Sequence, residues 1–259
     1  MEIYAHRGLF DLYPENSAEA ILESVDRGYG AEIDIRFSRD GEVVLIHDDS
    51  LRRLFGRDAK VKDLSASELS GLGFCARPSV RLALFRDLLR KLGGRRANLA
   101  IHFKQEEQNR DNCLKISSLF KEFGRYDDCF LFNLSLKACE TFRQIDRRIR
   151  LGVIVSDESF EPFVYIWKEI QEVIELFDII WAAEYKFLYS GSFFCKIKDA
   201  GKKAVAVSHE LHRALGHPKA FEGYQDPWDA FLRNRVSVCT DYPRVFKEFA
   251  DGFKGEDAL

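Results

Sequence analysis

Two acidic residues stand one position apart in a short apolar segment, Ala31-Glu32-Ile33-Asp34-Ile35. Side chains alternate along a strand, so Glu32 and Asp34 share one face there and lie about 7 Å apart. Two carboxylates on a buried face require a compensating charge. That charge is either a hard divalent cation or an ion-pair network with arginine or lysine, and the spacing leaves both open.

Two histidines follow strand-like segments in the same part of the chain. His6 ends residues 3–6 and is followed by Arg7, and His47 follows the apolar residues 43–46. Cleavage of a phosphodiester needs a base, an acid and positive charge near the phosphoryl oxygens. His6 and His47 are candidates for the acid and base, and the Arg7 guanidinium suits phosphate.

A helix is predicted between Arg7 and His47, with Asn16 or Ser17 as its cap and Gly28 as its stop. Glu15 immediately precedes that helix. A glutamate at this position either complements the helix dipole or lies close to the reactive side chains.

Short apolar segments alternate with segments of helical period along the whole chain, which predicts parallel strands covered by helices. Eight strands are expected, at residues 3–6, 31–37, 99–103, 130–133, 151–155, 179–182, 204–208 and 236–240. Helices are expected at residues 16–27, 87–92, 106–123 and 192–200. The order predicts an α/β fold of the TIM (β/α)8 type, with the reactive side chains at the carboxyl ends of the strands.

Residues 48–81 interrupt this alternation. They follow an Asp40-Gly41 turn and contain a capping box, Ser65-x-x-Glu68. We therefore expect one barrel domain over residues 1–259, with a small excursion after the second strand and a possible insertion at residues 48–81.

The overall charge is close to balanced, with 39 basic and 42 acidic residues among 259. This gives no field for nucleic acid or an anionic membrane, and no apolar run approaches the roughly 20 residues of a membrane helix. The amino terminus lacks the features of a secretory signal. The six cysteines form no C-x-x-C pair, which favours buried free thiols in a reducing compartment. We expect a soluble cytoplasmic protein that acts on a small molecule.

The motifs occur in an order that resembles the glycerophosphodiester phosphodiesterase family of the PI-PLC-like phosphodiesterase superfamily. The resemblance spans nearly the whole chain and is most specific in its first third. The motifs are His6-Arg7-Gly8, Pro14-Glu15-Asn16-Ser17, Glu32-x-Asp34, Asp40-Gly41, His47-Asp48-x-x-Leu51-x-Arg53, residues 63–69 and Thr240-Asp241-Tyr242-Pro243.

The resemblance implies a TIM barrel that hydrolyses a glycerophosphodiester to an alcohol and sn-glycerol 3-phosphate or a related phosphomonoester. It implies Mg²⁺ or Ca²⁺ on Glu32, Asp34 and a third acidic residue of the next barrel strand. His6 and His47 would be the general acid and base. The phosphate would be held by Arg7 and Lys104, with Glu15 nearby, where it orients a histidine or the substrate.

The third acidic residue is absent. The corresponding strand of the family resembles an Ile-Glu-Ile-Lys pattern, whereas this chain has Ile101-His102-Phe103-Lys104 after Ala100. His102 therefore takes the ligand position. An imidazole in place of a carboxylate removes a negative charge and adds a softer ligand. This change favours Mn²⁺, Fe²⁺ or Zn²⁺ over Ca²⁺ or Mg²⁺.

A second departure lies near the seventh strand, where Ala206-Val207-Ser208-His209-Glu210 stands in place of a Trp-Thr-Val-Asn pattern. The leaving alcohol is therefore expected to differ from that of simple glycerophosphodiesters. His209, His212 and His217 are interpreted as solvated, with His209 alone a candidate for the mouth. Glu184 either lines the opening or is a surface glutamate, and Tyr185 and Tyr189 are interpreted as core or rim packing.

Two other functions remain open on the sequence. One is a phospholipase D-like or cyclising lyase reaction on a lysophospholipid or a glycan phosphodiester. The other is a catalytically silent barrel that binds a phosphorylated ligand, which the loss of the third acidic residue suggests.

Overall fold

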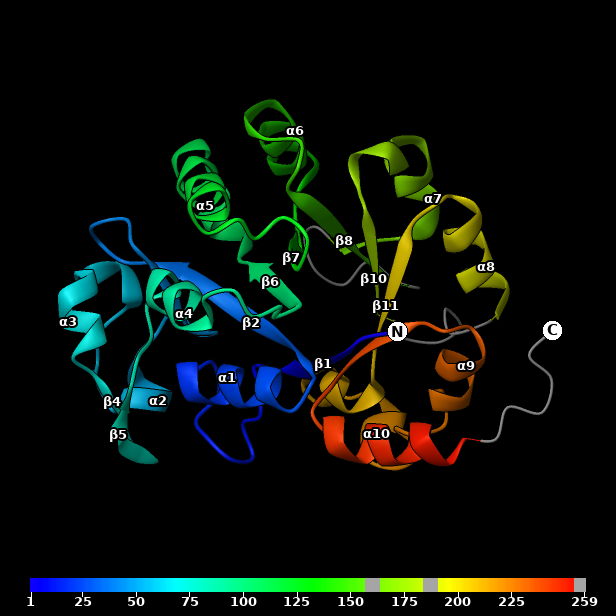
Figure 1. Cartoon of the computed structure of the whole chain (residues 1–259), viewed down its shortest axis with the longest axis horizontal. Coiled ribbons are helices and arrows are strands. Elements are labelled where there is room, and N and C mark those ends of the chain that lie inside the picture. Colours follow the sequence, from blue (N-terminus) through cyan, green and yellow to red (C-terminus); the bar gives the residue numbers. More distant parts are fainter. Residues whose placement is uncertain (157–163, 184–190, 254–259) are drawn as a thin grey trace.

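Eight parallel strands form a closed ring in the computed structural model, which describes residues 1–156, 164–183 and 191–253 (Figure 1). The strands are β1 (Ile3–His6), β2 (Gly30–Phe37), β6 (Leu99–Phe103), β7 (Cys129–Phe132), β8 (Arg150–Ser156), β10 (Ile179–Ala183), β11 (Lys203–Val207) and β12 (Ser237–Thr240). Each pairs with the next in this order, and β12 pairs with β1 to close the ring. The predicted TIM barrel is confirmed.

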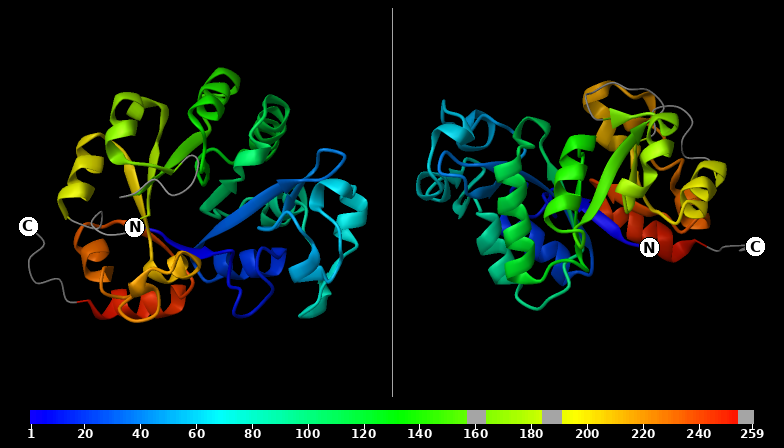
Figure 2. Two further views of the ribbon diagram at one scale, coloured as in Figure 1. Left: turned by 180° about the vertical axis from the view of Figure 1, so that it is seen from behind. Right: turned by 90° about the horizontal axis from the view of Figure 1, so that it is seen from above.

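Helices surround the ring on its outside (Figure 2). They are α1 (Ala18–Asp26), α4 (Phe85–Leu92), α5 (Arg110–Phe123), α6 (Leu136–Ile145), α7 (Trp167–Ile170), α8 (Gly191–Asp199), α9 (Trp228–Arg233) and α10 (Pro243–Gly252). Shorter elements are β9 (Val164–Tyr165) and the 3-10 helices η2 (Gln105–Glu107), η3 (Gln171–Leu176), η4 (His209–Leu215) and η5 (Pro218–Ala220). In the described ranges, no helix has both the length and the apolar character to cross a bilayer.

The caps explain where the helices begin. Ser17 accepts a hydrogen bond from the Ala20 backbone N–H and so starts α1, as the sequence predicts. The helix expected from residue 106 begins only at Arg110, because Asn109 caps it by accepting from the Asn112 backbone N–H. The residues before Asn109 form η2 instead.

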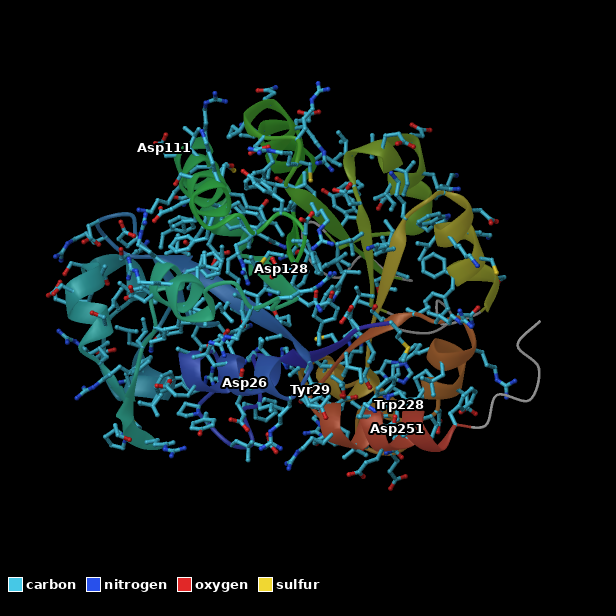
Figure 3. The ribbon with its side chains drawn as sticks, viewed as in Figure 1. Asp26, Tyr29, Asp111, Asp128, Trp228 and Asp251 are labelled. Atoms are coloured by element: carbon cyan, nitrogen blue, oxygen red, sulfur yellow. The ribbon has the colours of Figure 1, made fainter. Side chains whose placement is uncertain are left out.

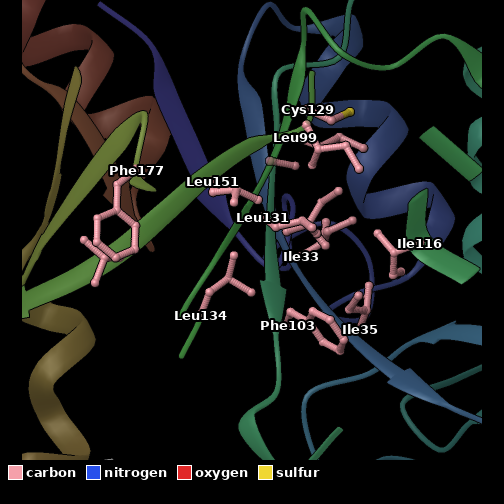
Figure 4. Close-up of a cluster of buried hydrophobic side chains, with 14 of the residues drawn as sticks. Ile33, Ile35, Leu99, Phe103, Ile116, Cys129, Leu131, Leu134, Leu151 and Phe177 are labelled. Carbon is pink, nitrogen blue, oxygen red and sulfur yellow. The ribbon is translucent and has the colours of Figure 1, made fainter. Parts of the chain in front are cut away.

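The strands bury both of their faces. Outward side chains such as Ile33, Leu131 and Leu151 pack with Ile116 of α5 and the other helices, as the close-up of this cluster shows (Figure 4). Inward side chains form a second apolar cluster that includes Tyr4, Phe130 and Trp181. The two clusters are what alternation predicts for strands covered on both sides.

The carboxyl-terminal helix is anchored through a buried tryptophan. Trp228 of α9 packs edge-on against Phe246 of α10, with ring centroids 5.0 Å apart. Its indole N–H donates to Ser208 Oγ at 3.0 Å, just after β11. Figure 3 labels Trp228 beside α10, whereas the exposed Asp111 projects from the outer surface of α5.

The excursion after β2 has an apolar cluster of its own. Strand β3 (Val43–Leu45) pairs antiparallel with β2 and is followed by α2 (Arg52–Phe55), η1 (Val61–Asp63), α3 (Ala66–Ser70), β4 (Gly73–Phe74) and β5 (Arg77–Arg81). The cluster contains Val44, Leu51, Val61 and Leu69. Ser65 and Glu68 form the predicted capping box at α3.

Candidate active site

The strand register places four polar side chains at one end of the barrel. His6 of β1 pairs with Glu32 of β2, and Asp34 of β2 pairs with His102 of β6. Residues paired in register point to the same side of the sheet, and Glu32 and Asp34 are two residues apart on β2, so all four share the inward face. The carboxyl ends of these three strands thus form a polar mouth above the apolar interior.

The two carboxylates have different surroundings. Asp34 binds Lys104 Nζ at 2.5 Å, has Arg7 Nε at 3.4 Å, and accepts from the Asn16 side-chain amide at 2.9 Å. Glu32 accepts from the Arg7 backbone N–H at 3.2 Å. Among the described residues its only side-chain ion-pair partners are two histidines, at 3.8 and 3.9 Å. Arginine and lysine therefore compensate Asp34 but leave Glu32 without a guanidinium or ammonium partner.

This difference separates the pKa values of the pair. Burial raises the pKa of Glu32 to about 7, and the neighbouring Asp34 carboxylate adds to the rise. Burial also opposes ionisation of Asp34, but the Lys104 ammonium and the His102 hydrogen bond hold its pKa well below the usual value. Asp34 is therefore stably ionised, whereas burial disfavours the ionised form of Glu32.

His6 is oriented by a residue from the last strand of the ring. Its Nδ1 lies 2.7 Å from Asp241 Oδ1, immediately after β12. Burial lowers the pKa of His6, but the Asp241 hydrogen bond and the Glu32 charge outweigh it and raise the value overall. With Nδ1 bound to Asp241, Nε2 is the nitrogen left for a ligand or a proton.

His47 reaches the same mouth through β3. The Ile46 backbone N–H donates to the Asp34 carbonyl at 3.0 Å, which places the end of β3 beside the acidic pair. His47 Nδ1 lies 2.8 Å from Asp48 Oδ1. Burial lowers the pKa of His47. Each of the two predicted catalytic histidines therefore has Nδ1 on a carboxylate.

Glu15 serves this arrangement indirectly. It binds Arg7 at 2.9 Å and Arg53 at 2.7 and 2.8 Å, and Arg53 binds Asp48 at 2.7 Å. Glu15 thus holds two arginines and reaches His47 only through Arg53 and Asp48. Its contacts with Arg7 and Arg53 place it beside the site rather than on a histidine.

His102 lies at the position that the sequence assigned to a third ligand. Its Nδ1 is 3.0 Å from Asp34 Oδ1 and 3.8 Å from Glu32 Oε1. Its Nε2 is 2.8 Å from the side-chain nitrogen of Asn133, and its ring stacks on Phe132. Burial and the Lys104 ammonium lower the pKa of His102 to about 4, so the imidazole is neutral and able to act as a ligand.

These residues also offer a cation site. Glu32, Asp34 and His102 each present a ligand atom within 4.8 Å of the others, and they are the one such group in the described ranges. Two carboxylate oxygens and an imidazole nitrogen suit a divalent cation of intermediate softness. The donor set fits, with the Lys104 ammonium now on the same Asp34 oxygen as a competing positive charge.

Several expectations need correction. His209, His212 and His217 are buried rather than solvated, with 2, 5 and 4% of their surfaces exposed. The rings of His209 and His217 stack with centroids 4.5 Å apart. They lie in η4 and at the start of η5, where tertiary packing covers a segment whose composition is polar.

The cysteines follow the prediction only in part. Cys113, Cys129, Cys139 and Cys239 are buried free thiols, whereas Cys75 and Cys195 are exposed. The rim residues Glu184, Tyr185 and Tyr189 lie outside the described residues.

Three residues have roles in the site that the sequence analysis does not predict. Asp241 orients His6, Asn133 contacts His102, and Asn16 binds Asp34 on two sides, because the Asp34 backbone N–H also donates to Asn16 Oδ1 at 2.9 Å. Two of them lie within quoted motifs, Pro14-Glu15-Asn16-Ser17 and Thr240-Asp241. Asn133 offered only its position at the end of a predicted strand.

A closed parallel barrel with carboxylates and histidines at the carboxyl ends of its strands has the architecture of a TIM-barrel enzyme. Solved structures share the fold. The chain superposes on a glycerophosphodiester phosphodiesterase from Agrobacterium tumefaciens with a TM-score of 0.70 at 21% identity, covering 95% of this chain and 99% of that one. It superposes on an Oleispira antarctica phosphodiesterase in complex with the product sn-glycerol-3-phosphate with a TM-score of 0.74 at 19% identity, covering 97% of each chain.

The chain is also similar in sequence to known proteins. Bacillus subtilis YqiK is 24% identical over 178 residues, which is 64% of this chain and 71% of that protein. A glycerophosphodiester phosphodiesterase of Bacillus altitudinis is 38% identical over 69 residues, or 26% of this chain and 28% of that protein. Residues 6–169 match the glycerophosphoryl diester phosphodiesterase family, and the chain belongs to that family. It is accordingly a phosphoric diester hydrolase.

Proposed function

We propose that this protein hydrolyses a glycerophosphodiester to an alcohol and sn-glycerol 3-phosphate or a related phosphomonoester, with the aid of a divalent cation. The observation that carries the proposal is the convergence of Glu32, Asp34 and His102 at the same barrel mouth as His6 and His47, whose Nδ1 atoms each lie on a carboxylate. The family membership and the product-bound Oleispira structure support the same substrate class.

The chemistry assigned to the chain's own residues is acid–base catalysis. His6 and His47 are held by Asp241 and Asp48, which fixes each ring and leaves Nε2 for proton transfer. One imidazole takes a proton from the attacking water, and the other gives a proton to the departing alkoxide. The P–O bond to water forms as the P–O bond to the alcohol breaks.

Positive charge in the mouth completes the proposal. Arg7 and Lys104 are basic side chains next to Asp34, and we assign them to the phosphoryl oxygens. Glu32, Asp34 and His102 would hold the cation, which when bound supplies charge that stabilises the transition state. We assign Mn²⁺, Fe²⁺ or Zn²⁺ before Mg²⁺ or Ca²⁺, because His102 replaces a carboxylate.

Hydrolysis of bis(p-nitrophenyl) phosphate tests the catalytic assignment. The parent, His6→Ala and His47→Ala are compared with a panel of divalent cations after removal of metal by a chelator. We expect each substitution to lower the rate by about 10²–10⁴-fold, the usual contribution of a positioned acid or base. Equal rates in all three proteins would instead indicate a barrel that binds phosphate without catalysis.

Product analysis in ¹⁸O-labelled water tests the reaction type. Hydrolysis of a glycerophosphodiester must place one labelled oxygen in the phosphomonoester, because water is the nucleophile. A cyclic phosphate product without label would show intramolecular attack and would replace hydrolysis by the lyase reaction. This measurement does not depend on which imidazole is the acid.

We further propose that residues 1–259 form one barrel domain, with residues 48–81 as an excursion, and that the protein works in the cytoplasm in glycerol and lipid metabolism. Four buried free thiols support a reducing compartment. Limited proteolysis tests the domain proposal, since a separate unit would release a stable fragment. Cell fractionation with an antibody tests the location.

A further inference from the structure

The imidazole of His102 is held on three sides. Its face stacks on Phe132, with centroids 4.9 Å apart and the planes inclined by 23°. Its Nδ1 edge faces Asp34 Oδ1 at 3.0 Å and Lys104 Nζ at 3.1 Å. Its Nε2 edge faces Asn133 Nδ2 at 2.8 Å. The ring position is therefore fixed, and what remains open is which nitrogen carries the hydrogen.

Asn133 is itself held firmly by its backbone. It has a positive φ of 62° and follows β7 directly. The side chain of Gln108 donates to the Asn133 carbonyl at 2.7 Å and to the Phe103 carbonyl at 2.9 Å, and it accepts from the Ser135 backbone N–H at 2.9 Å. Gln108 thus ties the turn after β7 to the end of β6, where His102 lies.

The side-chain amide of Asn133 has an uncommon feature. The residue is 5% exposed, and its Oδ1 is buried with no hydrogen-bond partner in the described part of the chain. A buried carbonyl oxygen without a donor costs about 1–3 kcal/mol. A half-turn of the amide exchanges Oδ1 and Nδ2 and places the acceptor against His102 Nε2.

The hydrogen-bond partners of the two ring nitrogens of His102 depend on each other, because a neutral imidazole carries a hydrogen on only one of them. If Nδ1 carries the hydrogen, it donates to Asp34, and Nε2 accepts from Asn133 Nδ2. If Nε2 carries the hydrogen, it needs an acceptor, and Nδ1 has a lone pair that Lys104 or a cation can take. Among the described contacts of Nε2, only Asn133 can supply both a donor and an acceptor, so its amide orientation and the His102 tautomer change together.

We propose that Asn133 is a positioning residue that sets the His102 tautomer and, with Oδ1 turned toward Nε2–H, presents the Nδ1 lone pair to the cation. The inference rests on the proposed cation site. A ligating histidine commonly donates its other ring N–H to an oxygen, and loss of such a partner typically costs 10–100-fold in metal affinity. Gln108 holds the turn from which Asn133 acts.

Two substitutions at Asn133 test this, and both tolerate a positive φ. Asn133→Gly removes the amide, and Asn133→Asp supplies an acceptor only. We expect the Mn²⁺ dissociation constant, measured by calorimetry, to rise by about 10–100-fold in Asn133→Gly and not to rise in Asn133→Asp. An unchanged constant in Asn133→Gly would overturn the proposal.

The same comparison in a His102→Glu background is the matched control, because a carboxylate has no tautomer to set. There Asn133→Gly should leave the Mn²⁺ dissociation constant unchanged. If it weakens binding equally in both backgrounds, Asn133 does not act through His102, and the proposal fails. Thermal unfolding of each protein reports whether the substitution has disturbed the fold.

Nuclear magnetic resonance of ¹⁵N-labelled histidine separates this inference from the proposed function. In cation-free protein, Asn133→Asp should hold the hydrogen of His102 on Nε2. In Asn133→Gly, which has no side chain to accept from Nε2, the tautomer with the hydrogen on Nε2 should be less populated than in Asn133→Asp. Identical tautomer populations in the parent and both variants would overturn the inference even if the enzyme is active. A parent that binds no cation but shows the tautomer shift would instead contradict the cation site of the proposed function.

Discussion

The barrel interior has two sectors with opposite properties. The polar sector lies on β1, β2 and β6, where His6, Glu32, Asp34 and His102 face inward. The apolar sector lies mainly on β7, β10 and β11, where Phe130, Phe132, Trp181 and Val205 belong to one buried cluster that extends to Tyr4 of β1. The same alternation of side chains builds both sectors, so the difference between them lies in side-chain chemistry and not in backbone geometry.

The comparison shows how a closed barrel tolerates buried charge. Phe132 stacks on Trp181 with ring centroids 4.1 Å apart, and it also stacks on His102 with ring centroids 4.9 Å apart. The apolar sector thus supports the wall against which the polar sector is built. We expect substitutions in the apolar sector to lower stability first and those in the polar sector to lower activity first.

The largest effect is expected at Asp34, because this residue contributes to both stability and activity. Asp34→Asn removes a proposed cation ligand and leaves the Lys104 ammonium, 8% exposed at its side chain, without its carboxylate. We expect turnover to be lost and the free energy of unfolding to fall by about 3–5 kcal/mol, the usual cost of breaking a buried ion pair. Urea denaturation and a turnover assay measure the two losses.

The control for Asp34→Asn is the double variant Asp34→Asn/Lys104→Met. It removes both charges, so much of the lost stability should return while activity stays absent. A single variant with parental stability would contradict the pairing of Asp34 with Lys104. Recovered activity in the double variant would contradict the role of Asp34 in the site.

A substitution in the apolar sector should affect stability alone. Phe130 is 2% exposed and packs edge-on against Tyr4, with centroids 5.9 Å apart. Phe130→Ala is expected to lower the free energy of unfolding by about 3–5 kcal/mol. The turnover of the remaining folded protein should stay near that of the parent. Leu114→Ala, at a site 44% exposed, is the control and should change stability by less than about 0.5 kcal/mol.

Glu32 should have the smallest effect on stability, and with the opposite sign. Its folded pKa of about 7 lies above the ordinary glutamate value of 4.5, so between these values the folded state binds more protons than the unfolded state. Stability therefore falls as pH rises from about 4.5 to about 7. Glu32→Gln removes this loss and should stabilise chelator-treated protein by about 1–3 kcal/mol at pH 8.

The measurement for Glu32 is urea denaturation at pH 5 and pH 8 in the presence of a chelator. The difference between the parent and Glu32→Gln should be larger at pH 8. Activity should be lost in the variant, because a cation ligand is gone. A variant less stable than the parent at pH 8 would contradict this, because it would show that ionised Glu32 stabilises the fold.

Much of the ring and part of the site could be predicted from local sequence. The eight strands were expected within about two residues of their observed bounds. The period of two placed Glu32 and Asp34 on one face without knowledge of the pairing, because alternation is a property of a single strand. His102 lies on another strand, and its ligand position came from the motif resemblance. The order of the motifs supplied His6 and His47.

What could not be predicted depends on contacts between distant segments. Asp241 meets His6 only because β12 closes the ring against β1. Asn133 reaches His102 only because β6 and β7 pair in one register and Gln108 holds the following turn. The polar sequence neighbours of His209 indicate a solvated side chain, whereas its burial comes from packing in three dimensions.

The central claim is that a cation is bound by Glu32, Asp34 and His102 at the mouth of the barrel. Anomalous diffraction from crystals soaked with Mn²⁺ and sn-glycerol 3-phosphate tests it most directly. The account predicts one strong anomalous peak in contact with all three side chains and with the phosphate, and Lys104 moved off Asp34. A peak elsewhere, or a phosphate bound by Arg7 and Lys104 with no cation beside Glu32, would contradict it.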